Sequence, residues 1–426
     1  MFNYFIKDYF LKSISILISG SFVAQFITII IAPLMTRLFS ATDIGLYTYL
    51  TTISYMFLPI ISGRYELAIV TEEYKRKIFV LVKICISISI ILTVFIGIFY
   101  LIYWIDTDKY EYLKFLPFII IHIFINGYIN IVTSWNNRFQ QYFLITAASV
   151  KRNLSLLFLT IFFGNFCPNI YGLLMSAIFS CLVSLHSQSK DLIKYINNIL
   201  FIPRKDIVTI LTKYKSFLIY SVPSAFINNF SYIAINFCIE ELYGLQVLAY
   251  YAISFRVLGL PLSLISNNIG KIYFEQSSRE YYSTGGFYRT FYKTFFILSV
   301  LAAPIGFILY FFSPLICDIF FGDEWRIAGE YIQIMTLMFV VRFIVSPLTV
   351  SVLVTKNNRF ELCGQILFLA NIFITYCLST INKYTIIEFL TLYSNLNIIS
   401  YVIWILIIFY LAKGGFDVTK EVKKYY

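Results

Sequence analysis

The chain has 426 residues, of which 59% are hydrophobic and only 13% are charged, and its formal net charge is +11. A soluble domain carries about 25% charged residues, so the composition excludes a soluble globule and indicates an integral membrane protein. The positive charge is spread along the chain without a basic tract, a zinc-ligand spacing or a recognition-helix pattern, so no nucleic-acid partner is expected.

Twelve segments are long and apolar enough to cross a membrane, because about twenty apolar residues span the hydrocarbon core as a helix. The first six expected spans are 14–36, 44–70, 78–103, 113–135, 143–163 and 168–187. The second six are 216–239, 246–270, 291–314, 329–354, 360–381 and 386–411. The fifth span is interrupted by Lys151 and Arg152, but a span that began after them would be too short to cross.

The lysines and arginines predict how these spans are oriented. With the N-terminus in the cytoplasm, most basic residues outside the spans fall in cytoplasmic segments, and only Arg37, Lys109, Arg326 and Lys383 fall on the other side. This asymmetry follows the positive-inside rule. We therefore expect both termini in the cytoplasm, and the rule also explains the net charge without a polyanionic partner.

Two pairs of similar segments suggest that the halves are duplicated. "NNRF" occurs at 136–139 and 357–360, after the fourth and tenth spans. The similar segments 37–50 and 241–254 each join an even-numbered span to the span before it. Duplicated halves are typical of transporters, whose substrate binds between two lobes. The predicted organisation is an N-terminal six-helix lobe (1–189), a cytoplasmic linker (190–215), a C-terminal six-helix lobe (216–411) and a cytoplasmic tail (412–426).

Several cations lie deep inside the predicted spans. Arg256 and Arg342 are central in spans eight and ten, roughly 15 Å or more from either boundary at about 1.5 Å per residue, which is too far for their side chains to reach the membrane surface. Lys151 and Arg152 point about 100° apart on a helix, so one of them is expected to face inward. Each cation could instead form a structural ion pair, but Glu66 is the only clear acid within a span. Unneutralised arginines suit an anionic ligand such as a phosphate.

The stretch "ISGRYELAIV" (61–70) places Arg64 and Glu66 near the cytoplasmic end of the second span. Residues two apart on a helix do not face each other, so a self-contained ion pair is not expected. On a continuous helix, Glu66 would share a polar face with Ser62, whereas Arg64 would lie on an apolar face and could reach the lipid phosphates. His122 in span four could relay protons, although a lone histidine in a helix is more often a hydrogen-bonded structural residue.

Other functions leave no signature in the sequence. HExxH and P-loop motifs, which would indicate a metalloprotease or ATP-driven transport, are absent. The seven scattered cysteines predict neither a disulfide framework nor a metal site, and no cofactor is expected. The longest expected periplasmic segment, around 315–328, is too short for the large loop of a polysaccharide polymerase. A cation-coupled drug antiporter remains an alternative, but it would favour carboxylates at the midplane.

Two segments carry a family resemblance. "APLMTRLFSATDIGLYTYLTTISYMFLPIISGRYELAIV" (32–70) ends in an R-Y-E-x-A-I pattern, and "FFGDEWRIAGEYIQIM" (320–335) contains an F-G-x-x-W-x-x-A-G element. Both resemble the Wzx-type O-antigen and polysaccharide flippases of the MOP (MATE-like) exporter superfamily. By itself the second segment also suits a helix start with Trp325 at the membrane interface.

The resemblance implies an all-α membrane protein, a MATE-like V-shaped bundle of two lobes, that is a transporter and not an enzyme. It would move an undecaprenyl-pyrophosphate-linked oligosaccharide from the cytoplasmic to the periplasmic leaflet of a bacterial inner membrane by alternating access. It implies that Arg64 and Arg256 bind substrate in the cavity, and that Glu66 is a candidate for a coupling ion. Expected partners are the lipid-linked oligosaccharide, the bilayer, a polysaccharide polymerase and a chain-length regulator.

Overall fold

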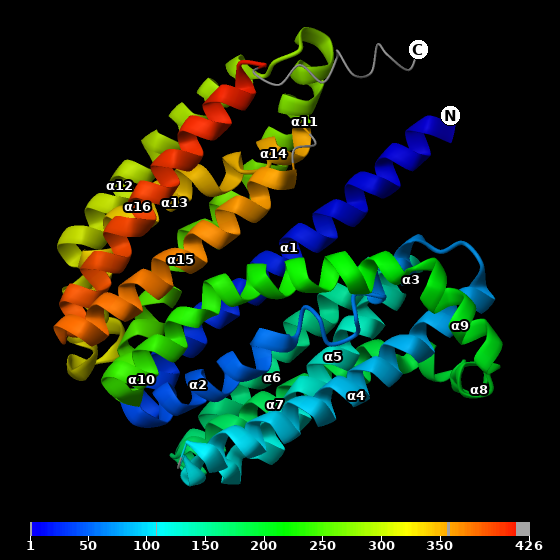
Figure 1. Ribbon diagram of the computed structural model, residues 1–426, viewed down its shortest axis with the longest axis horizontal. Helices are drawn as coiled ribbons and strands as arrows, with labels where there is room; N and C mark the ends of the chain where they lie inside the picture. Colours follow the sequence, from blue (N-terminus) through cyan, green and yellow to red (C-terminus); the bar gives the residue numbers. More distant parts are fainter. Residues whose placement is uncertain (1, 108, 356–357, 415–426) are drawn as a thin grey trace. The chain divides into compact units, whose positions relative to one another are not determined.

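The computed structural model describes residues 2–107, 109–355 and 358–414, and within these ranges it is helical without a β-strand (Figure 1). The first helices are α1 (Phe2–Leu38), α2 (Ala41–Phe57), α3 (Glu66–Thr71), α4 (Lys75–Asp106), η1 (Tyr110–Phe115), α5 (Leu116–Arg138), α6 (Tyr142–Phe166), α7 (Ile170–Ile193), α8 (Ile196–Leu200) and α9 (Arg204–Lys213). There follow η2 (Phe217–Ser221), α10 (Val222–Pro261), η3 (Leu262–Ser266), α11 (Asn267–Thr284), α12 (Tyr288–Phe321), η4 (Asp323–Trp325), α13 (Arg326–Leu348), α14 (Ser351–Val354), α15 (Asn358–Asn382) and α16 (Ile386–Ala412).

Nine stretches in the described part of the chain are long and apolar enough to cross a membrane. One of them, Phe217–Ser266, covers both the seventh and the eighth predicted spans, and its helical backbone is interrupted at Gly244, where φ is 84°. The described apolar part of α1, Phe22–Leu38, is shorter than the length required. The set is consistent with the twelve predicted spans, although within the described residues the second is broken after Phe57 and the tenth after Leu348.

The chain divides into two compact units, the N-terminal unit (Met1–Ile233) and the C-terminal unit (Ala234–Tyr426). The division falls inside α10, beyond the polar segment 190–215 that we expect to link the lobes. The predicted lobe boundaries therefore stay a prediction, and the two units are described separately.

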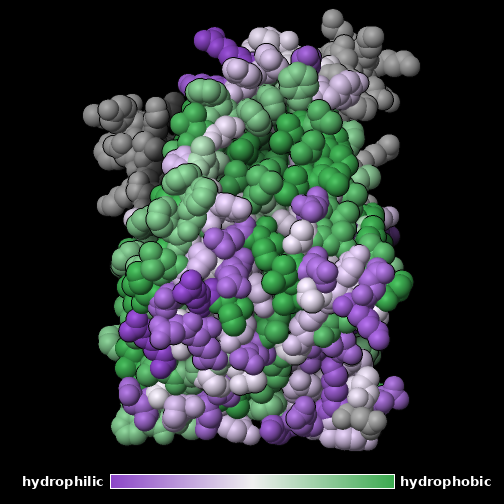
Figure 2. Space-filling view, turned by 90° about the vertical axis from the view of Figure 1, so that its left-hand side faces the viewer, coloured by the Kyte–Doolittle hydropathy of each residue, from purple (hydrophilic) through white to green (hydrophobic). Residues whose placement is uncertain are grey.

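In the N-terminal unit, α6 packs against α1 and α7, while α5 packs against α4 and α7. The outer faces of these helices are apolar: Ile91, Phe95 and Phe158 are 66%, 64% and 67% exposed. Exposed aromatic and aliphatic side chains at this density suit contact with lipid rather than water. Figure 2 shows one face of the molecule, on which hydrophobic side chains form broad areas and hydrophilic ones gather in separate patches.

The short helices of the predicted linker are part of the N-terminal unit's packing. Ile199 on α8 and Ile210 on α9 are buried in one hydrophobic cluster with Ile69, Phe79 and Trp135. Outside this cluster, Arg76 at the start of α4 forms a 2.8 Å ion pair with Asp206 of α9. The segment is therefore docked onto the end of the helical bundle.

In the C-terminal unit, α13 packs against α12 and α16 at the position of the F-G-x-x-W-x-x-A-G element. Helix α12 stops at Gly322, whose φ of 104° suits glycine. Trp325 is 2% exposed and its ring packs edge-on against that of Tyr250, so its side chain is part of the packing of the C-terminal unit. At Gly329, an added Cβ would lie 2.4 Å from the Cα of Pro314, so this glycine permits close approach of α12 and α13.

Candidate substrate site

The second predicted span is not one helix, and the prediction of a continuous helix over 44–70 is wrong. Helix α2 ends at Phe57, turns follow, and α3 starts at Glu66. Pro59 has no N–H for the helical hydrogen bond, and the Ile60 amide bonds to the carbonyl of Phe57 at 3.0 Å, one residue closer than in an α-helix. Gly63 and Arg64 then adopt positive φ values of 65° and 63°. The face-sharing argument for Arg64 and Glu66 therefore loses its basis.

The break leaves carbonyl groups of α2 without their helical donors, and a distant residue supplies the replacement. Asn229 of α10 donates from its side-chain amide to the carbonyl oxygens of Tyr55 (2.8 Å) and Met56 (3.1 Å). The ring of Phe226, one turn earlier on α10, lies 6.0 Å from that of Phe57. A carbonyl group without a partner is costly wherever water is excluded, as it is in a membrane, so Asn229 stabilises the broken end of α2.

Arg64 and Glu66 have separate partners. The half-buried Arg64 donates from Nε to the hydroxyl of Ser221 at 3.2 Å. The buried Glu66 accepts a 2.6 Å hydrogen bond from the hydroxyl of Ser62. Their side chains form no ion pair within 4.0 Å among the contacts of the described chain. The structure thus places a cation and a carboxyl group near each other at the break, each held by a serine.

The adjacent cations Lys151 and Arg152 on α6 differ in their surroundings. Lys151 is exposed. Arg152 is half-buried, forms a hydrogen bond with the side chain of Tyr55, and also lies near Tyr47 of α2 and Cys181 of α7. The groups that interact with Arg152 in the described chain include no carboxylate. One of the two cations therefore faces the interior of the N-terminal unit, and it is Arg152.

Polar side chains of α5 and α7 lie beside this arginine. His122 is 1% exposed, and its ring lies 5.5 Å from that of Tyr55 and 5.2 Å from that of Phe118. One turn further along α5, the Asn126 amide donates to the carbonyl of His122 at 2.8 Å and lies 3.6 Å from the Cys181 sulfur. Arg152, Tyr55 and His122 thus form a polar cluster where α2, α5, α6 and α7 meet.

The two deep arginines of the C-terminal unit are both half-buried, Arg256 on α10 and Arg342 on α13. The guanidinium carbon of Arg342 lies 5.7 Å from the ring centre of Phe255 and 5.4 Å from that of Phe339. These distances fit cation–π contacts. The assignment of Arg256 and Arg342 to substrate binding stays a prediction.

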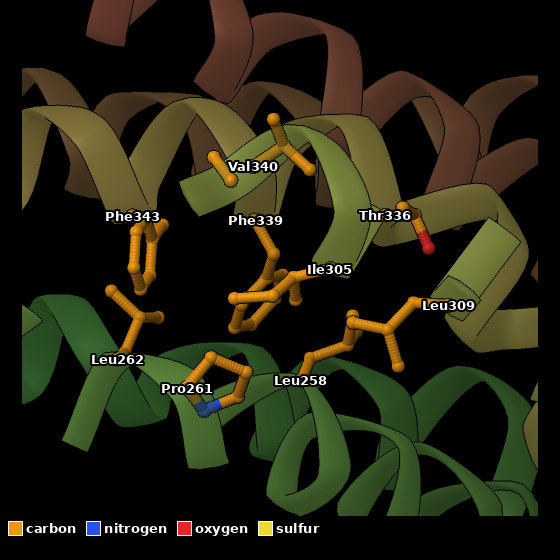
Figure 3. A pocket seen from close by; sticks show the side chains of 10 residues that line it. Leu258, Pro261, Leu262, Ile305, Leu309, Thr336, Phe339, Val340 and Phe343 are labelled. Carbon is orange, nitrogen blue, oxygen red and sulfur yellow. The ribbon is translucent and has the colours of Figure 1, made fainter. Parts of the chain in front are cut away.

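An apolar pocket lies in the C-terminal unit (Figure 3). It is formed by α10, η3, α12 and α13, and Thr336 supplies the only polar side chain in its lining. The lining residues are Leu258, Pro261, Leu262, Ala302, Ile305, Leu309, Thr336, Phe339, Val340 and Phe343. Because it is small and offers no charge, it does not provide a headgroup site.

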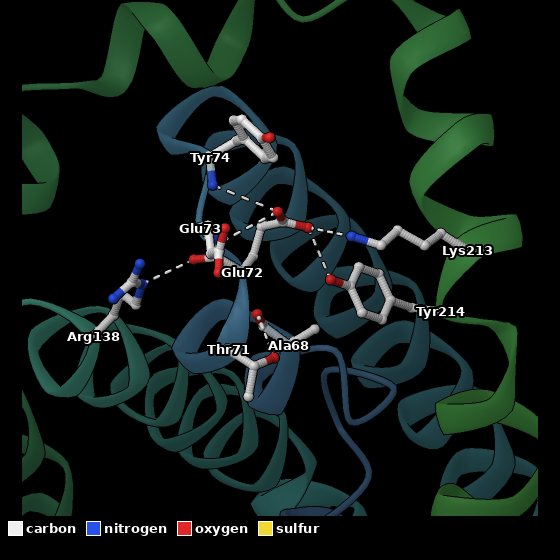
Figure 4. Close-up of polar contacts among 8 residues, drawn as sticks. All are labelled: Ala68, Thr71, Glu72, Glu73, Tyr74, Arg138, Lys213 and Tyr214. Atoms are coloured by element: carbon white, nitrogen blue, oxygen red, sulfur yellow. Dashed lines mark hydrogen bonds and ion pairs between the residues drawn. The ribbon is translucent and has the colours of Figure 1, made fainter.

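An ionic contact that the sequence did not reveal joins the predicted linker (190–215) to the rest of the N-terminal unit (Figure 4). The carboxylate of Glu72 accepts hydrogen bonds from Lys213 (2.6 Å) and Tyr214 (2.8 Å), and its backbone carbonyl accepts one from Arg138 (2.9 Å). Burial by itself would raise the pKa of Glu72, but the hydrogen bonds from Lys213 and Tyr214 and the lysine charge lower it to about 2. Glu72 therefore stays ionised at any physiological pH.

Sequence reasoning also missed Tyr55, Asn229 and Ser221. One signal was available for Tyr55: Pro59 follows it by four residues, so its carbonyl must find another donor. Nothing in the sequence shows that this donor is Asn229, because the contact joins residues far apart in the chain. In the described residues, no group of histidines, cysteines and carboxylates is arranged to hold a metal ion.

The described residues form a multi-pass, all-α membrane protein with a polar cluster inside its N-terminal unit. Its fold is similar to that of the lipid II flippase MurJ in an inward closed conformation, with a TM-score of 0.68 and 13% identity over 93% of this chain and 87% of that one. It is also similar to a multidrug resistance MATE family transporter of the MOP superfamily, with a TM-score of 0.55 and 12% identity over 93% and 95% of the two chains. A MATE transporter of Vibrio cholerae gives a TM-score of 0.56 at 12% identity, over 93% and 95%.

The family model described as polysaccharide biosynthesis protein matches residues 34–330. The chain therefore belongs to the polysaccharide biosynthesis protein family. No curated protein matches the sequence. The predicted all-α fold class and the resemblance to polysaccharide biosynthesis proteins with a MATE-like fold are confirmed.

Proposed function

We propose that this protein is a flippase that moves an undecaprenyl-pyrophosphate-linked oligosaccharide, an O-antigen or related repeat unit, from the cytoplasmic to the periplasmic leaflet of a bacterial inner membrane. The family match supports the place of the protein in polysaccharide synthesis. The fold shared with a lipid II flippase supports transport of a lipid-linked substrate.

The observation that carries the proposal is the position of Arg152. Its guanidinium group faces the interior of the N-terminal unit, beside Tyr55 and Tyr47, and no carboxylate in the described chain neutralises it. A guanidinium group binds phosphate oxygens through paired hydrogen bonds, and tyrosine rings suit the apolar faces of sugars. In the same unit, Arg64 would supply further positive charge, while exposed Lys151 would contact the pyrophosphate only at the edge of the site. Arg256 and Arg342 of the C-terminal unit remain separate candidates for substrate binding.

Alternating access would carry the headgroup across the membrane, while the prenyl tail stays in the bilayer beside the apolar outer faces. With both termini in the cytoplasm, the protein would receive its substrate on the cytoplasmic side and deliver it to a polysaccharide polymerase and a chain-length regulator. Glu66 is the candidate carboxyl group for a coupling ion.

A cation-coupled exporter of drugs or other small molecules is the second candidate. It is favoured by the fold shared with MATE transporters and by the burial of Glu66, which holds a carboxyl group inside the N-terminal unit. Such a protein would not need positive charge in its interior.

Complementation of a flippase-deficient strain separates these candidates. The variants are Arg64→Ala, Glu66→Ala, Arg152→Ala, Arg256→Ala and Arg342→Ala, with exposed Lys205→Ala as the control. We expect the wild type and the control to restore surface polysaccharide, and the arginine variants to accumulate lipid-linked repeat units on the cytoplasmic side. Normal surface polysaccharide from every arginine variant, at normal expression, would refute the cationic site.

A further inference from the structure

The imidazole of His122 is one of several buried polar groups in the N-terminal unit that lack a hydrogen-bond partner, and it can also bind a proton. Its side chain is 1% exposed, and Nδ1 has no hydrogen-bond partner among the described residues. Buried polar atoms almost always have a partner, and an exception asks for a reason.

The groups around His122 can be named helix by helix. Helix α2 contributes the ring of Tyr55, and also that of Tyr47, which lies near Arg152. Helix α6 contributes the guanidinium group of Arg152. Helix α7 contributes the thiol of Cys181, which contacts the side-chain amide of Asn126. On α5 itself, Phe118 stacks against the ring. Arg152 is therefore the only permanent charge in this part of the described chain.

A positive charge on the imidazole would be repelled by Arg152 and unfavourable in an apolar interior. A pyrophosphate bound at Arg152 would reverse the sign of the local charge, and the same imidazolium would then be attracted. The effect is strong because the dielectric constant is low away from water.

We propose that His122 takes up a proton when an anionic pyrophosphate headgroup binds at Arg152, so that headgroup and proton cross the membrane together. The proton comes from the solution to which the site is open, and it returns to solution when the headgroup leaves. The ring of Tyr55 lies 5.5 Å from that of His122, and Tyr55 is 41% exposed, so a headgroup at the surface of the N-terminal unit could contact it. The proton reduces the charge that must pass through the apolar interior.

This inference rests on the proposed function, because it needs a pyrophosphate ligand. The test is calorimetric titration of the purified full-length protein in detergent with geranylgeranyl pyrophosphate, in two buffers of different ionisation enthalpy. The heats give the number of protons bound with the ligand. His122→Gln keeps a neutral, polar side chain that cannot take the proton, and Arg152→Gln removes the proposed anchor.

We expect the wild type to bind about one proton more per ligand than His122→Gln, and its affinity relative to that variant to rise by up to about tenfold for each unit that the pH falls. Arg152→Gln should bind the probe at least about tenfold more weakly. Equal proton numbers in wild type and His122→Gln would overturn the inference and leave the proposed function standing. Absence of binding by the wild type would overturn both.

A second variant and a second measurement keep the test decisive if His122→Gln does not fold. His122→Asn is the alternative variant, and size-exclusion profiles report folding for both. If neither folds, the pH dependence of the wild type decides, because protonation of the pyrophosphate itself weakens binding as the pH falls. Wild-type binding that strengthens between pH of about 8 and about 6 supports uptake by His122, and binding that weakens contradicts it.

Discussion

The side-chain amide of Asn229 lies 2.8 Å from the carbonyl oxygen of Tyr55, the residue whose side chain also meets Arg152. The contact joins the start of α10 to the broken end of α2, 174 residues earlier in the chain. It thereby supports the same turn of helix that presents the Tyr55 ring to the polar cluster. The hydrogen-bond partner of Arg152 is thus held in place by the contact between Asn229 and the broken end of α2.

Asn229→Ala should lower the stability of the protein. The change removes the donor for two carbonyl groups, and we expect a loss of about 1 kcal/mol, measured as a lower melting temperature in detergent. Asn228→Ala is the matched control, because the neighbouring side chain makes no hydrogen bond in the described structure. Pro59→Ala would restore the missing N–H, so Asn229→Ala should cost less in that background; an equal cost in both backgrounds would contradict the explanation.

Glu72→Gln should release the linker helix α9 from the bundle. The carboxylate holds Lys213 and Tyr214, and loss of a charged hydrogen-bond partner costs about 2 kcal/mol. Exposed Glu73→Gln, the adjacent carboxylate, is the control. Chemical denaturation in detergent gives the free energies.

The same residue predicts a pH dependence with a defined sign. The pKa of Glu72 is lowered in the folded protein, from about 4.5 to about 2. Its contribution to stability is therefore complete above about pH 4.5 and is lost as the pH falls from there toward 2. The difference in unfolding free energy between wild type and Glu72→Gln should shrink over this window, and a difference that does not change with pH would show that the ion pair is not its source.

Gly329→Ala should destabilise the C-terminal unit. The added methyl group would meet the backbone of Pro314 at 2.4 Å, and overpacking of this kind costs about 1–3 kcal/mol. Gly259→Ala is the control, because a Cβ there meets nothing within 4 Å and alanine favours a helix. A melting temperature of Gly329→Ala equal to that of the control would show that α12 and α13 do not need this contact.

Arg152 and Lys151 should differ in their importance for transport. Arg152→Gln removes the interior guanidinium group and should reduce the rate of surface polysaccharide synthesis by about tenfold or more, while Arg152→Lys should recover part of it, since lysine keeps the charge without the paired donors. Lys151→Gln, on the exposed neighbour, should have a smaller effect. Pulse labelling of surface polysaccharide in the complemented strain measures the rates, and a larger loss from Lys151→Gln would contradict the placement of the site.

Hydropathy was enough to predict where the helices lie, because membrane spans need long apolar runs whatever their packing. It could not predict the break after Phe57, since prolines such as Pro33 and Pro304 lie inside continuous helices of the same structure. The pair at 151–152 predicted one interior cation, but only the rotation of α6 decides that it is Arg152. The contacts of Asn229, Ser221 and Glu72 join segments that are far apart in the chain, so no local sequence pattern predicts them.

The most direct test of the central claim follows the substrate itself. Purified protein is reconstituted into vesicles that contain an undecaprenyl-pyrophosphate-linked oligosaccharide in both leaflets, and membrane-impermeant periodate oxidises the sugars that reach the outer surface. We predict that periodate eventually oxidises all of the lipid-linked sugar in vesicles with wild-type protein, but only the outer-leaflet share in vesicles with Arg152→Gln or without protein. Oxidation limited to the outer-leaflet share with wild-type protein would contradict its role as a flippase.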